Sequence, residues 1–172
     1  AAWKLLDPGL RRIGVITGRH TKYMIDEAEA AAKSNGLELE RIEVPSDRAV
    51  LSAVQELREK RIQGLWLAPD SSILSQRAIL ELMAYSVKNN LQVLAFSPAL
   101  LKEGALLSAS SDIDEITHLV LERLKKARPG NAGMPGEAAV PLASARIVVN
   151  GSIAARFGLT IPSKLKEQAD VQ

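Results

Sequence analysis

Short polar side chains follow the apolar, strand-length runs of this sequence. The candidate ligand-binding residues are Thr17, Asp70, Ser71, Ser97, Ser108 and Asp112. Hydroxyl groups donate and accept hydrogen bonds, and a carboxylate attracts an ammonium group or accepts from sugar hydroxyls. This set therefore suits the binding of a small polar solute. The alternative is helix N-capping by Ser46, by Ser71 or Ser72, and by Ser111, at about 1 kcal/mol each; capping does not exclude ligand contact.

Residues that could carry catalysis are scarce. The chain has no Cys, which excludes thiol nucleophiles, thiolate metal sites and disulfides. His20 is interpreted as a solvated loop residue and His118 as a mid-helix surface or packing residue, and the two cannot make a zinc site by themselves. The sequence holds no G-x-S-x-G elbow, phosphate loop or G-x-G-x-x-G fingerprint. We therefore expect a non-enzymatic protein with no cofactor and no metal.

One signalling alternative deserves a comparison. Asp70 after the third strand and Ser97 after the fourth occupy the places of the phosphoacceptor Asp and the switch Ser/Thr of receiver domains. Receivers also need an acidic pair after the first strand to hold Mg²⁺, but Thr17, Gly18 and Arg19 stand there. Without carboxylates the metal is not held and phosphoryl transfer lacks its electrophilic help. Only a degenerate receiver-like domain survives this comparison.

Composition indicates a soluble, packed protein. The 172 residues suit one domain, or one domain with a tail, with 47% hydrophobic and 24% charged residues. Lys and Arg number 22 against 20 Asp and Glu, and aromatic residues make up 3%. This balance argues against nucleic-acid binding. No apolar run is long enough for a membrane span, and the first residues lack the basic and apolar order of a signal peptide.

Apolar runs of strand length alternate with stretches of helical period. The predicted strands are 12–16, 37–44, 64–68, 91–96, 105–108 and 146–150. Helices are predicted between them, over 21–35, 47–60, 73–89 and 111–126. This rhythm predicts an α/β fold, doubly wound, with a mainly parallel sheet of five to six strands and helices on both faces. Ligands of such sheets bind at the carboxyl ends of the strands.

A change of composition divides the chain. Residues 1–128 form the predicted ligand-binding lobe, residues 129–141 are rich in Pro and Gly and form a linker, and 142–172 form a strand and helix tail.

Three segments together resemble a known family. They are 11–16, followed by a helix that leads into Gly36-Leu37-Glu38-Leu39; 64–70 with 96–106; and 148–170, with Asn150, Ala154 and the run Gly158-Leu159-Thr160-Ile161-Pro162. In this order they resemble the second half of the ABC-transporter substrate-binding proteins of the tryptophan/tyrosine type, which have a type I periplasmic-binding-protein fold. The resemblance spans about 10–170, and its last segment is the most specific.

The resemblance implies a function. It implies one lobe of a two-lobed protein that captures an amino-acid-like solute, delivers it to a permease and ATPase complex, and works in the periplasm or cell envelope. Asp70 and Ser71 match the family's Pro-Pro-Asp loop, Ser97 the loop after the next strand, and 108–112 the lobe-crossing segment, so these residues would line one wall of a cleft.

Helix 111–126 would by analogy return to the first lobe. Its apolar stripe is Ile113, Ile116, Leu119, Val120 and Leu124. We expect this stripe to be covered, either by the missing first lobe or by a second copy of this chain in a homodimer. A solitary lobe that serves dimerisation or sensing without transport is the other function that the sequence leaves open.

Overall fold

The computed structural model describes residues 1–19, 21–126 and 145–172, so His20 and the predicted linker 129–141 lie outside the described residues. The chain forms two compact units. The first unit comprises Ala1–Ala109 and Ile147–Gln172, and the second comprises Ser110–Arg146.

Seven strands form one sheet in the order β2-β1-β3-β4-β5-β6-β7. Their bounds are β1 Arg12–Thr17, β2 Glu38–Glu43, β3 Gly64–Trp66, β4 Gln92–Ala95, β5 Leu107–Ser111, β6 Ala145–Val149 and β7 Asp170–Val171. The described pairings of β1 with β2 and β3, of β3 with β4, of β4 with β5 and of β6 with β7 are all parallel. The predicted fold class is confirmed.

The seventh strand exceeds the predicted five to six. It pairs with β6 over only two residues and is joined at its end by two backbone hydrogen bonds, Gly151 N to Gln172 O at 2.7 Å and Gln172 N to Val149 O at 3.0 Å. Two residues are too few for a period-two pattern, so this strand leaves no signal in the sequence.

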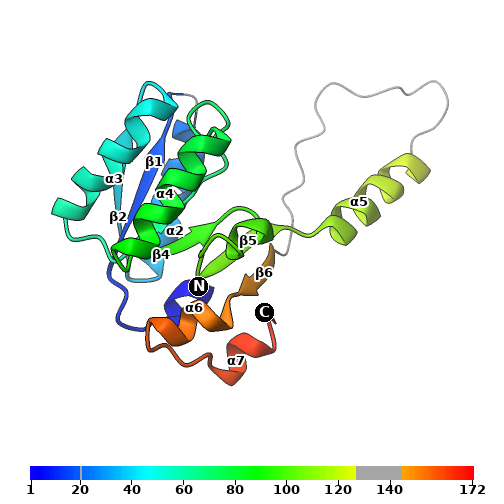
Figure 1. Cartoon of the computed structure of the whole chain (residues 1–172). Coiled ribbons are helices and arrows are strands. Elements are labelled where there is room, and N and C mark those ends of the chain that lie inside the picture. The colour runs from blue at the N-terminus through cyan, green and yellow to red at the C-terminus, as the bar shows by residue number, and fades with distance from the viewer. Residues whose placement is uncertain (20, 127–144) are drawn as a thin grey trace. The chain divides into compact units, whose positions relative to one another are not determined.

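Helices lie on both faces of the sheet. The α-helices are α1 Ala2–Leu6, α2 Lys22–Ser34, α3 Val50–Glu59, α4 Gln76–Lys88, α5 Ile113–Lys126, α6 Gly151–Arg156 and α7 Ser163–Lys166, with 3-10 turns at η1 Asp47–Ala49 and η2 Pro98–Leu101. Figure 1 shows α3 and α4 side by side on one face, whereas α2 lies on the other. A core of Val54, Leu57 and Leu82 packs the first pair onto the strands, as the helical spacing predicts.

Helix α4 begins later than predicted. Ile73 and Leu74 donate their backbone N–H groups to Asp70 O at 3.3 and 2.9 Å, which makes a turn after β3. Ser75 is extended and is the N-cap of α4, and its hydroxyl accepts from Ala78 N at 3.2 Å. The prediction of an N-cap at Ser71 or Ser72 was therefore wrong. The Asp70 carboxylate accepts from Ser72 N within this turn, and Ser75 begins the helix.

The base of the first unit is a small buried cluster around Trp3. The indole Nε1 donates to Gln92 Oε1 at 2.7 Å, and Gln92 Nε2 donates to Asp7 Oδ2 at 2.6 Å. The ring of Trp3 rests against Gly64, where an added Cβ would collide with it. Trp3 is thus a packing residue, and it fixes the short helix α1, which no pattern in the sequence predicts.

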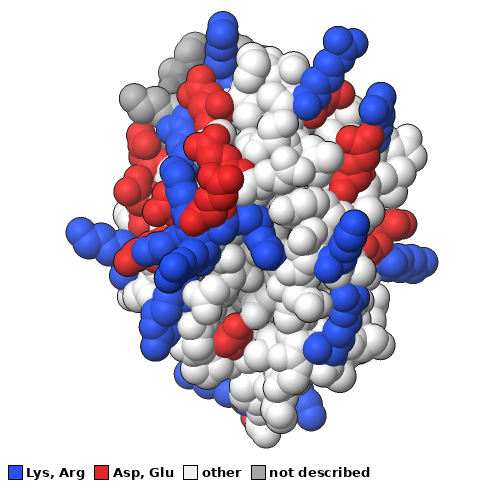
Figure 2. All heavy atoms as spheres, turned by 60° about the vertical axis from the view of Figure 1, so that its left-hand side comes forward, with Lys and Arg blue, Asp and Glu red and all other residues white. Residues whose placement is uncertain are grey.

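The β2 edge of the sheet carries charges of both signs. Arg12 pairs with Glu38 at 2.7 Å, Lys60 with Glu40 at 3.4 Å and Arg41 with Glu43 at 3.1 Å. Figure 2 shows blue and red side chains interleaved on this side of the molecule. A charged edge discourages pairing with another strand. Across the described part of the chain, no helix combines the length and apolar character needed to cross a membrane.

Candidate ligand-binding rim

Three neighbouring strands of the first unit end on the same edge of the sheet. Because β1, β3 and β4 run parallel and adjacent, their carboxyl ends meet there. Thr17 ends β1, Asp70 and Ser71 follow β3, and Ser97 follows β4. Because β5 begins later than the predicted 105–108, Ser108 is its second residue and is level with Ala95 at the end of β4. We call the predicted residues of the first unit the polar rim. The polar rim consists of Thr17, Asp70, Ser71, Ser97 and Ser108. The strand order therefore places the predicted set along one edge, where open parallel sheets bind ligands.

Asp70 is the best-connected member of the polar rim. Its side chain is buried, with 6% of the residue exposed. Oδ2 accepts from Gly18 N at 2.8 Å and from Thr21 Oγ1 at 3.2 Å. Oδ1 accepts from Ser72 N at 3.0 Å and from Ser72 Oγ at 2.5 Å. Burial raises the pKa of Asp70, but the hydrogen bonds from Ser72, Gly18 and Thr21 outweigh it and hold the pKa below its ordinary value.

Thr17 and Ser108 are fully buried. Thr17 Oγ1 accepts from Arg41 Nε at 3.2 Å, so its hydroxyl has a partner in the neighbouring edge strand. Ser108 Oγ has no hydrogen-bond partner among the described residues. In this conformation neither hydroxyl reaches the surface.

Ser71 and Ser97 are the accessible members of the polar rim. Ser71 is exposed and Ser97 is half-buried. Ser97 precedes η2, and its hydroxyl accepts from Ala99 N at 3.3 Å, so Ser97 is the N-cap of this 3-10 turn. These are the two rim side chains that a solute could touch without any movement of the loops.

Asp112 belongs to the second unit. Its Oδ1 accepts from Asp114 N at 2.9 Å and from Glu115 N at 3.2 Å, so the carboxylate caps α5. On α5 itself, Ile113 is 70% and Leu124 63% exposed, and Val120 and Leu121 are also exposed. The apolar stripe predicted for this helix is thus largely uncovered in the described structure.

A polar hollow of about 480 Å³ lies beside η1 and the first turns of α4. Its lining includes Asp47, Arg48, Arg77 and Glu81. Arg77 pairs with Glu81 at 2.8 Å, and Ser75 Oγ donates to Asp47 at 2.8 Å. Three of the four charged groups that line this hollow, Arg77, Glu81 and Asp47, are therefore already partnered within the chain.

Sequence reasoning missed the partners that organise the polar rim. Gly18 and Thr21 reach Asp70 from a loop about fifty positions away, and Ser72 joins them from two positions along the same loop as Asp70. Arg41, which donates to the Thr17 hydroxyl, lies in the predicted strand 37–44 but was not predicted to contact the site. Alternating charges on an edge strand predict exposure, not which charge turns inward to a hydroxyl.

A doubly wound parallel sheet with polar strand tips along one edge defines a periplasmic-binding-protein-like α/β domain. The chain belongs to the ABC transporter substrate binding protein family, whose profile matches residues 3–172. No curated protein matches the sequence significantly.

Solved structures agree on the fold. A domain from Streptococcus pneumoniae, described as an ABC domain in complex with L-Trp, has a TM-score of 0.74 at 23% identity over 98% of this chain and 57% of its own. A conserved domain protein from Vibrio cholerae has a TM-score of 0.72 at 21% identity, over 99% of this chain and 57% of its own. A substrate binding protein with adhesive properties from Clostridium difficile has a TM-score of 0.67 at 19% identity, over 98% of this chain and 56% of its own. The chain spans little more than half the length of each.

Proposed function

We propose that this chain is one lobe of the substrate-binding component of an ABC importer, and that it captures a small, amino-acid-like solute without chemical change. The observation that carries the proposal is the polar rim on the ligand-binding edge of a sheet whose sequence belongs to this family. A second lobe completes the site, and the loaded protein delivers the solute to a permease and ATPase complex. The protein works in the periplasm or at the cell envelope.

Five of the six predicted residues divide by exposure in this proposal. Ser71 and Ser97 hydrogen-bond the solute, because their side chains are accessible. Thr17 and Ser108 stand behind them and shape the loop ends, since both are fully buried. Asp112 lies in the crossing segment that leads to the other lobe. Its Oδ1 caps α5, so its second carboxylate oxygen contacts the solute.

Helix α5 supplies the contact with the second lobe in this proposal. Its exposed apolar side chains, Ile113 and Leu124 above all, need a partner surface. The matching structures are nearly twice as long as this chain, which leaves room for another lobe in a longer polypeptide. The same stripe supports the second candidate, a solitary lobe that dimerises through α5 and serves sensing or assembly. The receiver-like alternative is disfavoured, because a strand at Ala145–Val149 is not expected in a receiver.

Isothermal titration with the standard L-amino acids tests the proposal, and L-tryptophan is included because the pneumococcal structure holds it. We expect weak but saturable heat for at least one amino acid, since a single lobe buries only part of the solute. The double variant Ser71→Ala, Ser97→Ala should weaken that binding by about tenfold, as loss of hydrogen bonds predicts. Ser34→Ala is the matched control, because this exposed hydroxyl donates to Ala31 O of its own helix at 2.9 Å and accepts from the adjacent Asn35 Nδ2 at 3.4 Å, away from the polar rim. No heat with any amino acid, or equal heats for the double variant and the parent, would contradict the proposal.

A further inference from the structure

We propose that Asp70 is a positioning residue: its carboxylate clamps the loop after β1 to the loop after β3, and the solute binds beside this clamp instead of pairing with it. The inference rests on the proposed solute-binding function. It assigns Asp70 a different task from that of an acidic partner for a solute ammonium group.

The first argument is the saturation of the carboxylate. Four donor contacts reach its two oxygens: Gly18 N and Thr21 Oγ1 on one, Ser72 N and Ser72 Oγ on the other. A carboxylate has about four acceptor sites; Gly18 N, Ser72 N and Ser72 Oγ fill three of them, and Thr21 Oγ1 fills the fourth when its single proton points to Asp70 and not to Gly18 O. With 6% of the residue exposed, a solute ammonium would have to displace internal donors to bind there. Such an exchange brings little net gain, because one hydrogen bond replaces another.

The second argument is how closely the two loops approach. A Cβ built on Gly18 would collide with Ser72 Oγ and lie 3.1 Å from Asp70 Oδ2. Glycine therefore lets the backbone after β1 approach this carboxylate while the Ser72 hydroxyl keeps its place on Asp70. The clamp joins residues 52 positions apart in the sequence, so it is a tertiary contact and not a local turn.

The third argument is what the clamp fixes. Thr21 is the N-cap residue of α2, and its hydroxyl lies within reach of both Gly18 O, at 3.1 Å, and Asp70 Oδ2. The start of α2 is thereby tied to the turn that carries Ser71. The neighbouring Ser72 is held from the other carboxylate oxygen, which sets the direction of the exposed Ser71 backbone. When the loops of a site are already ordered, binding costs less conformational entropy and the affinity is higher.

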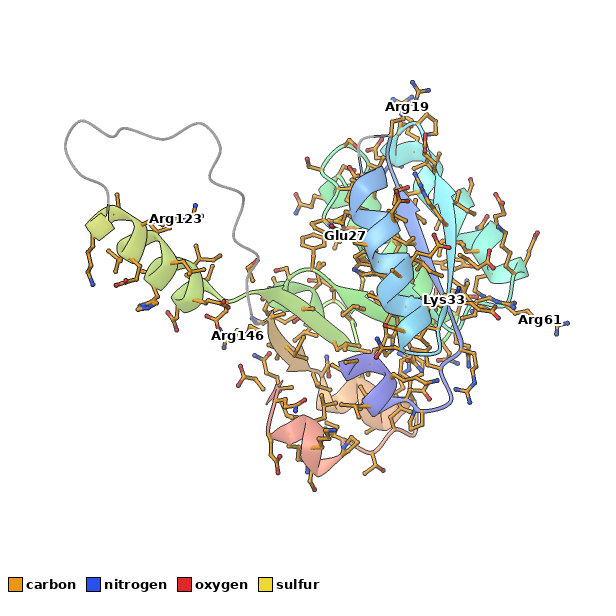
Figure 3. The ribbon with its side chains drawn as sticks, turned by 180° about the vertical axis from the view of Figure 1, so that it is seen from behind. Arg19, Glu27, Lys33, Arg61, Arg123 and Arg146 are labelled. Atoms are coloured by element: carbon orange, nitrogen blue, oxygen red, sulfur yellow. The ribbon has the colours of Figure 1, made fainter. Side chains whose placement is uncertain are left out.

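Limited proteolysis with trypsin measures the clamp without any ligand. Arg19 is exposed in the clamped loop, and Arg61 is exposed in the turn before β3; Figure 3 shows them toward opposite ends of the strands. We expect Asp70→Ala to raise the ratio of cleavage after Arg19 to cleavage after Arg61 by about tenfold, because charge-assisted hydrogen bonds are lost. General destabilisation would raise both rates together. Asp47→Ala, which removes a carboxylate that accepts from Ser75 Oγ on the same edge, is the matched control and should leave the ratio unchanged.

Gly18→Ala provides an independent arm, because it opens the loop while Asp70 stays in place. We expect Gly18→Ala to raise the ratio of cleavage after Arg19 to cleavage after Arg61, here called the Arg19 ratio, as Asp70→Ala does. Ser72→Ala should raise the Arg19 ratio less, since Gly18 and Thr21 keep their contacts with Asp70. If neither Asp70→Ala nor Gly18→Ala changes the ratio, the clamp is refuted. Should Asp70→Ala fail to fold, the Gly18→Ala result decides.

Titration with L-tryptophan and the other standard amino acids then links the clamp to binding. A positioning role predicts that Gly18→Ala and Asp70→Ala weaken binding of the same amino acid by similar factors. Complete loss of binding in Asp70→Asn with an unchanged Arg19 ratio would show direct pairing and overturn the inference. If the parent chain itself gives no heat, the proposed solute-binding function fails, and the positioning role fails with it, whereas the proteolysis still shows whether the loops are joined.

Discussion

Two glutamines hold the N-terminal segment against the sheet, and they should contribute very differently to stability. Gln92 is buried, at 7% exposed, where it accepts from the Trp3 indole at 2.7 Å and donates to Asp7 at 2.6 Å. Gln63 is exposed; its Oε1 accepts from the backbone of Arg11 at 2.6 Å and its Nε2 donates to Gly9 O at 3.1 Å. The two side chains therefore do similar work in different surroundings.

The magnitude follows from what each substitution leaves unpaired. Gln92→Ala leaves the Trp3 N–H without its acceptor in a site that is 4% exposed, at a cost of about 1–3 kcal/mol. The lost methylene burial adds about 1 kcal/mol. We expect Gln92→Ala to lower the free energy of unfolding by about 2–4 kcal/mol. Gln63→Ala should cost less than about 1 kcal/mol, because water replaces its partners.

Urea unfolding, followed by circular dichroism and by the fluorescence of Trp3 and Trp66, measures both variants at neutral pH. The slope of the unfolding free energy against urea concentration should be the same for both variants and the parent, so that a shift of the unfolding midpoint reports a change in stability alone. If Gln63→Ala costs as much as Gln92→Ala, the reasoning that burial decides the value of these hydrogen bonds is refuted.

Further predictions concern the clamp, the base of the sheet and α5. The pKa of Asp70 is lowered in the folded chain, so the ionised carboxylate stabilises the fold above about pH 4. This stability is lost as the pH falls through the pKa that Asp70 has in the folded chain. The difference in unfolding free energy between the parent and Asp70→Asn, measured with urea, should therefore shrink as the pH is lowered. An Asp70→Asn difference that grows toward acid pH would contradict that sign. Gly64→Ala should lower stability by about 1–3 kcal/mol, because its methyl group meets the Trp3 ring, and an unchanged urea midpoint would argue against this packing. The isolated chain should self-associate at micromolar concentration through α5, and Ile113→Glu with Leu124→Glu should make it monomeric in analytical ultracentrifugation; a monomeric parent would exclude the homodimer.

The order of elements could be predicted because each signal is local. Val54 and Leu57 mark the buried side of α3 through their helical spacing, and the apolar run at 64–68 marks a central strand. The last strand and α1 could not be predicted, because each is short and is stabilised by tertiary contacts: Gly151 with Gln172 for β7, and Trp3 with Gln92 for α1. Local pattern determines long elements, whereas short ones depend on their partners.

The candidate site was located by the same logic but not resolved by it. The rule that ligands bind at the carboxyl ends of parallel strands selects the edge that carries Asp70, Ser97 and Ser108. It does not tell which side chain faces inward. That choice depends on side-chain contacts between loops, such as those of Thr17 with Arg41 and of Asp70 with Gly18, which have no signature in a single sequence.

An acidic residue after a parallel strand invites the reading that it binds a cation or an ammonium group, and Asp70 shows why exposure must be considered first. A buried carboxylate must be paired or hydrogen-bonded, since leaving it unpaired is costly. Here the chain supplies those partners from Gly18, Thr21 and Ser72, and the same bonds join two loops of the polar rim. The charge is therefore already used within the protein. In the proposed site, Ser71 at the surface of the clamp and Ser97 after β4 remain for a solute, so selectivity should follow from hydrogen bonding and from the proposed second lobe more than from this carboxylate.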